Sequence, residues 1–254
     1  MRLLAKVCLL LAIMGFLSCG NETGSGKELA MAESEPVLAD QVLVFTKTLG
    51  YRHKSIEKGV ATLKELGSTH GFEVTQTEDS LAFSSENLKK YQLVVFLSTT
   101  MDVLGPPQEK AFEAYIENGG AYLGIHAAAD TEYDWPWYGQ MAGAWFKSHP
   151  KQQEARIEVV DQTHPSTAHL GDSWTHFDEL YNYKDISPDI HVLMKLDETT
   201  YEGGENGDFH PIAWYHEVGQ GRSFYTGLGH TDESWDDAKF RQHLLGAIDY
   251  CLGR

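Results

Sequence analysis

The chain has 254 residues, of which 37 are acidic and 20 are lysine or arginine, so its formal charge at pH 7 is −17. This acidic balance, with no cluster of basic residues, argues against a nucleic acid partner. Cys251 is the one cysteine after residue 19, so no disulfide is expected within the folded part of a mature chain. The length suits one α/β domain with a sizeable core.

Residues 1–18 have the pattern of a secretory signal peptide. A basic start with Arg2 and Lys6 precedes an apolar run over residues 7–17, which is shorter than the ~20 apolar residues that span a bilayer. The run ends at Ser18-Cys19-Gly20, which resembles a bacterial lipobox, with Phe16 where leucine is usual. We expect export, lipid attachment at Cys19 and residence in the cell envelope. The sequence leaves open which face of the membrane holds the protein. The alternative is a plain secretory signal with cleavage nearby.

Residues 19–40 are small, polar and acidic and have no apolar period. Such a composition predicts a flexible tether that holds a domain over residues 41–254 away from a membrane. No stretch of the domain has the length and apolarity of a membrane span, so the lipid anchor is the expected membrane contact.

The first half of the domain alternates predicted strands and helices. Strands are expected at 41–46, 72–75, 92–97 and 121–125, and helices over 55–70, from Ser84 or Ser85 to Lys90, and over 106–118. Continuous apolar strands separated by helices predict an α/β fold, with helices on both faces of a mostly parallel sheet. Ligands of such sheets bind at the carboxyl ends of the strands, which points to the segments after Thr46, Leu97 and Ile125.

The second half of the domain is less regular. The expected elements are strands at 154–160 and 191–196, a hairpin of 211–217 and 222–226 around a glycine-rich turn, and a closing helix over 234–252.

His126 is the strongest candidate for chemistry. The predicted strand at 121–125 runs into His126, and three alanines then allow a tight turn into a helix, as in a nucleophile elbow. If the helix begins at once, Asp130 faces the same way as His126. The two would then serve as a general base with its orienting carboxylate, or as metal ligands. The alternative is a buried, hydrogen-bonded packing role for His126.

Two more histidines follow predicted strands. His53 comes after the first strand, where it would serve as a base, a metal ligand or an ordinary loop residue. His230 follows Gly227-Leu228-Gly229, whose glycines would let the backbone approach a ligand closely.

Asp178 and Glu179 are adjacent, so they would not point together from a strand. One of them is expected to reach the site while the other faces water, and a solvated turn is the alternative for both. His149 follows an aromatic patch and is a candidate for substrate binding or an exposed loop residue.

Several aromatic residues lie close together in the sequence. Trp135, Trp137, Tyr138 and Trp145 would form a carbohydrate platform, because the C–H faces of sugars stack on aromatic rings. Core packing is the alternative for these side chains.

A divalent metal ion is an open alternative, and no other cofactor is predicted. His126, His53 and His230 offer suitable ligand atoms, together with Asp130 and His149. No HExxH or CxxC spacing links them, so such a site would have to be assembled from distant loops.

The ordered set of motifs closely resembles the ThuA-like family, named for trehalose utilisation. The motifs are Tyr51-Arg52-His53, the His126 segment, Trp135, Trp137, Gly143-Ala144-Trp145-Phe146, His149-Pro150, His164-Pro165, Asp178-Glu179-Leu180-Tyr181, His210-Pro211-Ile212-Ala213-Trp214, Gly221-Arg222 and Gly227-Leu228-Gly229-His230. The resemblance implies a flavodoxin-like sheet related to class I glutamine amidotransferases, which place a cysteine at the elbow. Because His126 stands there in this chain, glutaminase chemistry is not expected.

The resemblance also implies sugar metabolism, near the breakdown of keto sugars and disaccharides. The first hypothesis is an enzyme on a 3-keto sugar, in which His126 removes a proton, Asp130 orients it, and His230 or His53 acts as acid or electrophile. Hydrolysis, elimination and isomerisation stay open, and so does the oligomeric state. The expected substrate-binding residues are Trp135, Trp137, Trp145, His149, Glu179 and Tyr181. The alternatives are a non-catalytic sugar-binding lipoprotein and an amidotransferase-like hydrolase, which the missing cysteine disfavours.

Overall fold

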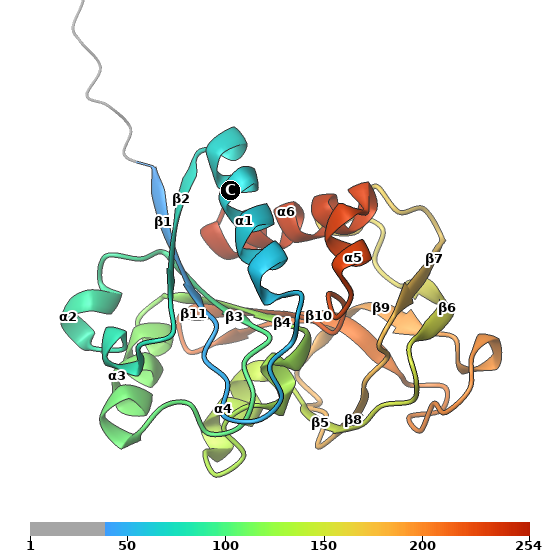
Figure 1. Cartoon of the computed structure of the whole chain (residues 1–254), viewed down its shortest axis with the longest axis horizontal. Helices are drawn as coiled ribbons and strands as arrows, with labels where there is room; N and C mark the ends of the chain where they lie inside the picture. Colours follow the sequence, from blue (N-terminus) through green and yellow to red (C-terminus); the bar gives the residue numbers. More distant parts are fainter. Residues whose placement is uncertain (1–38) are drawn as a thin grey trace, which may run out of the picture. The chain divides into compact units, whose positions relative to one another are not determined.

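The computed structural model describes residues 39–254 (Figure 1). The predicted signal peptide, Cys19 and nearly all of the predicted tether lie outside these residues, so their predictions stay untested. A nine-stranded sheet in the order β2-β1-β3-β4-β11-β10-β9-β6-β7 runs through the domain. Among the described residues, no helix has the length and apolarity needed to cross a membrane.

The sheet has a parallel half and an antiparallel half. Neighbouring strands from β2 to β11 are parallel, and those from β11 to β7 are antiparallel. The strands of this sheet are β1 (Asp40–Phe45), β2 (Phe72–Thr77), β3 (Leu93–Leu97), β4 (Ala121–Ile125), β6 (Gln153–Val159), β7 (Ser173–Asp178), β9 (His191–Leu196), β10 (Pro211–Val218) and β11 (Gly221–Thr226). A separate antiparallel pair joins β5 (Trp145–Ser148) to β8 (Asn182–Lys184).

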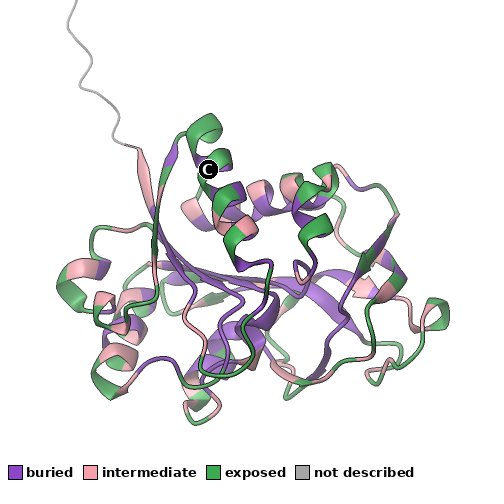
Figure 2. Cartoon of the chain, viewed as in Figure 1, coloured by how far each residue is buried: buried purple, intermediate pink, exposed green. Residues whose placement is uncertain are grey.

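Helices lie on both sides of the sheet, as Figure 1 shows. On one side are α1 (Ile56–His70), α5 (Asp232–Asp236) and α6 (Ala238–Leu252), and on the other are α2 (Ser85–Leu88), α3 (Pro106–Glu117) and α4 (Pro136–Ala142). Every residue of β3 and β4 is buried, and the buried core follows the sheet (Figure 2). The predicted α/β fold, with a mostly parallel sheet covered on both faces, is confirmed.

The closing helix expected over residues 234–252 is two helices. The chain is extended at Asp237, with φ of −68° and ψ of 120°, and the Asp237 carboxylate accepts a hydrogen bond from the backbone N–H of Lys239. Aspartate caps a helix start in this way, so a new helix begins at Ala238. No elements were predicted at α4, β5, β7 and β8; α4, β5 and β8 are short, with 7, 4 and 3 residues, whereas β7 has 6.

Gly124, near the end of β4, allows close packing next to the site. A Cβ atom on Gly124 would lie 2.9 Å from the Tyr225 ring of β11 and 2.4 Å from the Tyr122 hydroxyl. Without that atom, Tyr225 packs across β4, and its hydroxyl donates a hydrogen bond of 2.6 Å to the backbone carbonyl of His126.

Candidate functional site

Four side chains from distant parts of the chain converge at the carboxyl ends of the strands. His53 comes from the loop after β1, His126 follows β4, Glu179 follows β7, and His230 follows β11. One nitrogen or oxygen atom from each lies within 4.8 Å of the others. The structure therefore brings together three of the four predicted catalytic residues, and it adds Glu179, which was predicted to bind substrate.

His126 occupies the elbow that its position after β4 predicted. Its φ is 50°, in the left-handed region that non-glycine residues rarely adopt, and its side chain is fully buried. Such strain persists where surrounding contacts impose it, as the Tyr225 hydrogen bond does here. The elbow leads into a 3-10 helix, η2 (His126–Asp130), where an α-helix was expected.

The imidazole of His126 is held in one tautomer. Its Nδ1 lies 2.9 Å from the carbonyl oxygen of Gly227, and a carbonyl can only accept, so Nδ1 carries the proton. The lone pair of Nε2 then points into the cluster, 3.0 Å from His230 Nδ1 and 3.4 Å from Glu179 Oε2.

Asp178 fixes the backbone that carries His230. Its buried carboxylate accepts hydrogen bonds from the backbone N–H groups of Gly229 (2.7 Å) and His230 (3.0 Å) and from the Ser234 hydroxyl (2.9 Å). Gly229 has a φ of 112°, which favours glycine at this turn. Burial opposes ionisation of Asp178, but His176, His126 and the backbone N–H of Gly229 outweigh it and lower its pKa.

The Glu179 carboxylate lies close to three histidine side chains. Its Oε2 is 3.1 Å from His230 Nδ1, and its Oε1 is 3.2 Å from His149 Nδ1. Burial opposes ionisation, but the imidazoles of His126 and His230 outweigh it and lower the pKa of Glu179. The expectation that either Asp178 or Glu179 faces water is wrong, because β7 ends at Asp178 and the strand alternation ends with it.

His53 is neutral in the folded protein. Burial, and then the nearby imidazoles of His126 and His230, lower its pKa to about 2. Its Nδ1 is buried and has no hydrogen-bond partner among the described residues. A buried nitrogen without a partner is costly, so this atom is a candidate for ligand contact.

Asp130 does not orient His126. Its carboxylate accepts a hydrogen bond of 2.5 Å from the Tyr133 hydroxyl, while the His126 nitrogens face Gly227, His230 and Glu179. A 3-10 helix has about three residues per turn, so side chains four apart do not align as they do in an α-helix. Asp130 still lines the same pocket, where burial raises its pKa.

Three members of the cluster, His53, Glu179 and His230, line a pocket of about 360 Å³, while His126 is fully buried. The Tyr181 ring lies 4.3 Å from the His126 ring and 4.3 Å from the Phe146 ring, which gives the pocket an aromatic wall. His149 lines it too, with a side chain that is 43% exposed. Tyr51 and Phe146 stand in the motifs of the resemblance but were not predicted as site residues, and Gln152 was not singled out.

The three tryptophans predicted as a platform do not line this pocket. Trp135 stacks on Trp137 with ring centroids 5.0 Å apart, and Trp137 and Trp145 line a different cavity of about 730 Å³. Trp145 and Phe146 are neighbours in β5 and point to opposite sides, so Phe146 lines the pocket and Trp145 lines the other cavity.

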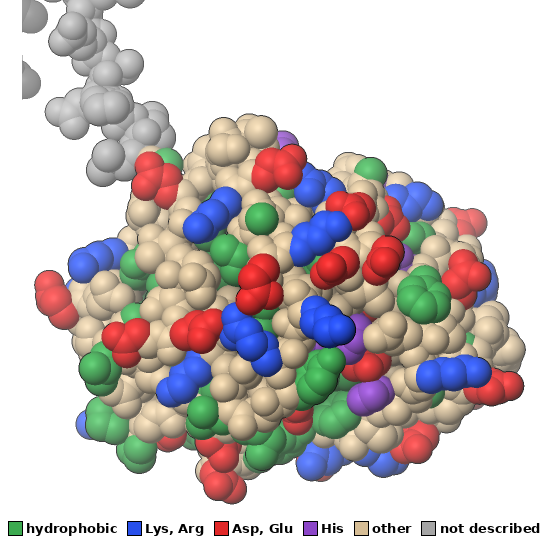
Figure 3. Space-filling view, viewed as in Figure 1, with side chains coloured by type: hydrophobic (Ala, Val, Ile, Leu, Met, Phe, Trp, Pro, Cys, Tyr) green, Lys and Arg blue, Asp and Glu red, His purple; other side chains and the backbone are tan. Residues whose placement is uncertain are grey.

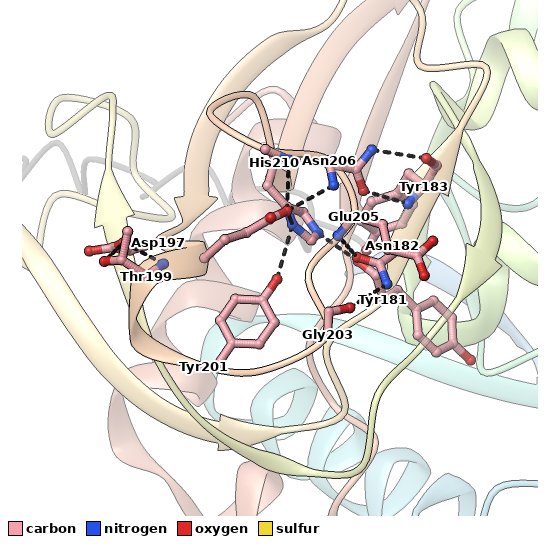
Figure 4. Close-up of polar contacts among 12 residues, drawn as sticks. Tyr181, Asn182, Tyr183, Asp197, Thr199, Tyr201, Gly203, Glu205, Asn206 and His210 are labelled. Atoms are coloured by element: carbon pink, nitrogen blue, oxygen red, sulfur yellow. Dashed lines mark hydrogen bonds and ion pairs between the residues drawn. The ribbon is translucent and has the colours of Figure 1, made fainter.

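A polar network supports the segment that carries Tyr181 (Figure 4). His210 Nε2 donates a hydrogen bond of 2.8 Å to the backbone carbonyl of Tyr181, and His210 Nδ1 lies 2.6 Å from Glu198 Oε1. The Asn206 side chain accepts a hydrogen bond from the backbone N–H of Tyr183 and donates one to the Tyr183 carbonyl. These contacts hold residues 181–183, directly after Glu179, against the loop at 197–210.

Comparisons with known proteins agree with this architecture. The family model described as ThuA, trehalose utilisation, matches residues 41–251. The chain belongs to the ThuA family. No curated protein sequence matches the chain.

Several solved structures of other proteins are similar to this ThuA domain. A thua-like protein from Bacteroides uniformis is 26% identical, with a TM-score of 0.73, covering 87% of this chain and 94% of that one. A thua-like protein from Parabacteroides merdae is 22% identical, with a TM-score of 0.70 and coverage of 85% and 91%. A GMP synthase component from Thermoplasma acidophilum shares the fold at 14% identity, with a TM-score of 0.55 and coverage of 85% and 95%.

ThuA-like proteins belong to the class I glutamine amidotransferase-like superfamily. In this member, Cys251 is buried in α6 with its sulfur 3.5 Å from the carbonyl of Tyr122, near the start of β4. His126 follows the opposite end of that strand. Burial also raises the pKa of the Cys251 thiol, so neither its place nor its ionisation suits a nucleophile at the elbow.

The low pKa of His53 predicts how stability depends on pH in metal-free protein. The unfolded chain protonates this histidine below pH about 6.5, whereas the folded protein does not until about 2. The stability that neutral His53 contributes is therefore complete above pH about 6.5 and is lost as pH falls.

His53→Gln should remove this titration and flatten the slope of unfolding free energy between about pH 6 and about pH 5, by up to ~1.4 kcal/mol per pH unit. Denaturant titrations at several pH values measure the slope. His70→Gln, at an exposed position in α1, is the matched control. Equal slopes for wild type and His53→Gln would show that His53 titrates normally in the fold.

Proposed function

We propose that His53, His126, Glu179 and His230 bind a divalent metal ion, and that the domain is an enzyme acting on a 3-keto sugar. The observation that carries the proposal is the convergence of these four side chains within 4.8 Å, because three of them line a pocket with an aromatic wall and His126 is fully buried beside them. Membership of a family described as trehalose utilisation supports a carbohydrate substrate.

The spacing of the cluster suits an ion. Ligand atoms at about 2.0–2.1 Å from a tetrahedral zinc ion lie about 3.3 Å from one another. The three atoms His126 Nε2, His230 Nδ1 and Glu179 Oε2 are 3.0, 3.1 and 3.4 Å apart. The lone pair of His126 Nε2 and the neutral state of His53 leave nitrogen atoms free to coordinate. The hydrogen bond to Gly227 also orients His126 in the way that metal-bound histidines are usually oriented.

Three nitrogen ligands and one carboxylate suit manganese, iron, cobalt, nickel or zinc. An ion with five or six ligands would keep a position for the substrate and would polarise its keto oxygen, which acidifies the neighbouring C–H bond.

Two groups in the same pocket are free to move protons while the cluster holds the ion. His149 Nδ1 lies 2.9 Å from the carbonyl of Pro150, so it carries a proton and leaves Nε2 as a base. Asp130 has a pKa raised by burial, which makes its carboxylate a better proton acceptor. Proton removal next to the keto group would begin an elimination, isomerisation or hydrolysis. Tyr181 and Phe146 would hold the sugar ring.

The proposal predicts metal-dependent turnover of a 3-keto glucoside followed by proton NMR. A chelator should abolish conversion, and one added divalent ion should restore it. Asp130→Asn should lower kcat by about 10²-fold or more, since general base catalysis supplies about that factor.

Asp134→Asn changes an exposed aspartate four residues away and should keep full activity. Saccharide binding without conversion, in both the metal-loaded and metal-free protein, would contradict the enzyme and favour a sugar-binding lipoprotein.

We also propose that the domain acts in the cell envelope, held by a lipid on Cys19. The support is the basic start, the apolar run and the lipobox-like segment at residues 16–20. Cys19→Ser should move the protein from the membrane fraction to the soluble fraction after cell lysis, as judged by immunoblotting. An unchanged membrane fraction would contradict lipid attachment at this cysteine.

A further inference from the structure

A second pocket of about 300 Å³ adjoins the one above the histidine cluster. The two pockets share Tyr51, Gln152 and His230 in their walls. The second pocket, here called the outer pocket, is completed by Lys54, Thr231, Asp232 and Glu233. On the face drawn in Figure 3, histidine surface lies beside basic and acidic side chains. A ligand above the cluster would therefore extend past His230 into a polar compartment.

Four polar side chains of the outer pocket have no partner among residues 39–254, whereas the Thr231 hydroxyl bonds Ser234. Lys54, Gln152, Asp232 and Glu233 are exposed, and their side chains make no hydrogen bond or ion pair with any residue in the range 39–254. The neighbouring Arg52, by contrast, pairs with both Glu57 and Glu78 at 2.8 Å. Charges of both signs and an amide at one place suit a neutral ligand that carries many hydroxyl groups.

Tyr51 stands where the two pockets meet, and its side chain remains exposed at 62%. Its ring centroid lies 4.9 Å from that of His53, edge to face. The backbone beneath it is fixed, because the Thr100 hydroxyl donates to the Tyr51 carbonyl (3.1 Å) and accepts from the Gly50 N–H (3.1 Å). An exposed aromatic ring on a fixed loop between polar groups is suited to stack on a sugar ring.

We propose that the outer pocket is a binding subsite for a second sugar ring, with Tyr51 as its stacking platform. The reacting ring occupies the inner pocket above the cluster, and the glycosidic bond passes His230. Each pocket is near the lower end of the about 300–1,000 Å³ that small-ligand sites occupy, which suits one ring in each. The ligand class is thus a two-ring glycoside, and this assignment rests on the proposed function.

The test compares binding of one-ring and two-ring probes to the metal-loaded protein by calorimetry. The probes are 3-keto-glucose and 3-keto-trehalose. Wild type should bind the two-ring probe at least about tenfold more tightly, and Tyr51→Ala and Lys54→Ala should each reduce that preference several-fold. Binding of the one-ring probe should change less than twofold in Lys54→Ala, because Lys54 lines the outer pocket and not the inner one. Phe209→Ala and Lys64→Ala, at exposed positions outside both pockets, are the matched controls.

The outcomes separate the two proposals. If wild type binds both probes with equal affinity, or if Lys54→Ala weakens both equally, the outer subsite is overturned while the proposed function stands. If wild type binds neither probe, both proposals are overturned. A preference for the two-ring probe that is lost in Tyr51→Ala and Lys54→Ala and kept in the controls supports the subsite.

Discussion

The hydrogen bond between His126 Nδ1 and the carbonyl of Gly227 determines what this site can do. It spans the ends of β4 and β11, which are adjacent parallel strands, and it leaves the Nε2 lone pair directed into the cluster. The backbone of His126 is strained at a φ of 50°, and the Tyr225 hydroxyl from β11 holds it there. The elbow and the tautomer therefore both depend on the pairing of these two strands.

The other members of the cluster are anchored in the same way, by contacts between distant segments. Asp178, at the end of β7, holds the backbone of Gly229 and His230 after β11, so Glu179 and His230 reach the cluster together. His210 holds the Tyr181 carbonyl just beyond. Because Asp178 is buried and ionised, protonating it at low pH would weaken both segments at once. The site is thus assembled by the fold as a whole, and no single helix or loop contains it.

Much of the fold could be predicted from apolar strands and their alternation with helices, because the parallel half of the sheet is buried on both faces. The positions of His53 and His126 followed from the rule that ligands bind at the carboxyl ends of parallel strands, whereas His230 was singled out by the glycines before it. Glu179 was chosen from a motif, but its contacts depend on β7, which was not predicted.

The errors have physical causes. Asp130 was paired with His126 on the assumption of an α-helical turn, and the 3-10 geometry of η2 removes that alignment. The tryptophans were grouped by sequence distance, whereas Trp137 and Trp145 line another cavity. The pocket wall comes from Phe146 and Tyr181, which β5 and the turn after β7 bring together across 35 residues of sequence. Such long-range pairing leaves little local signal in one sequence.

Metal content of the purified protein tests the central claim most directly. Mass spectrometry of wild type, His126→Ala and the exposed control His70→Ala, each checked for folding by circular dichroism, gives the number of bound ions per chain. We predict one divalent transition-metal ion in wild type and His70→Ala, and its loss in folded His126→Ala. Folded wild type that takes up no such ion when supplied with one, or His126→Ala that retains it, would contradict the account.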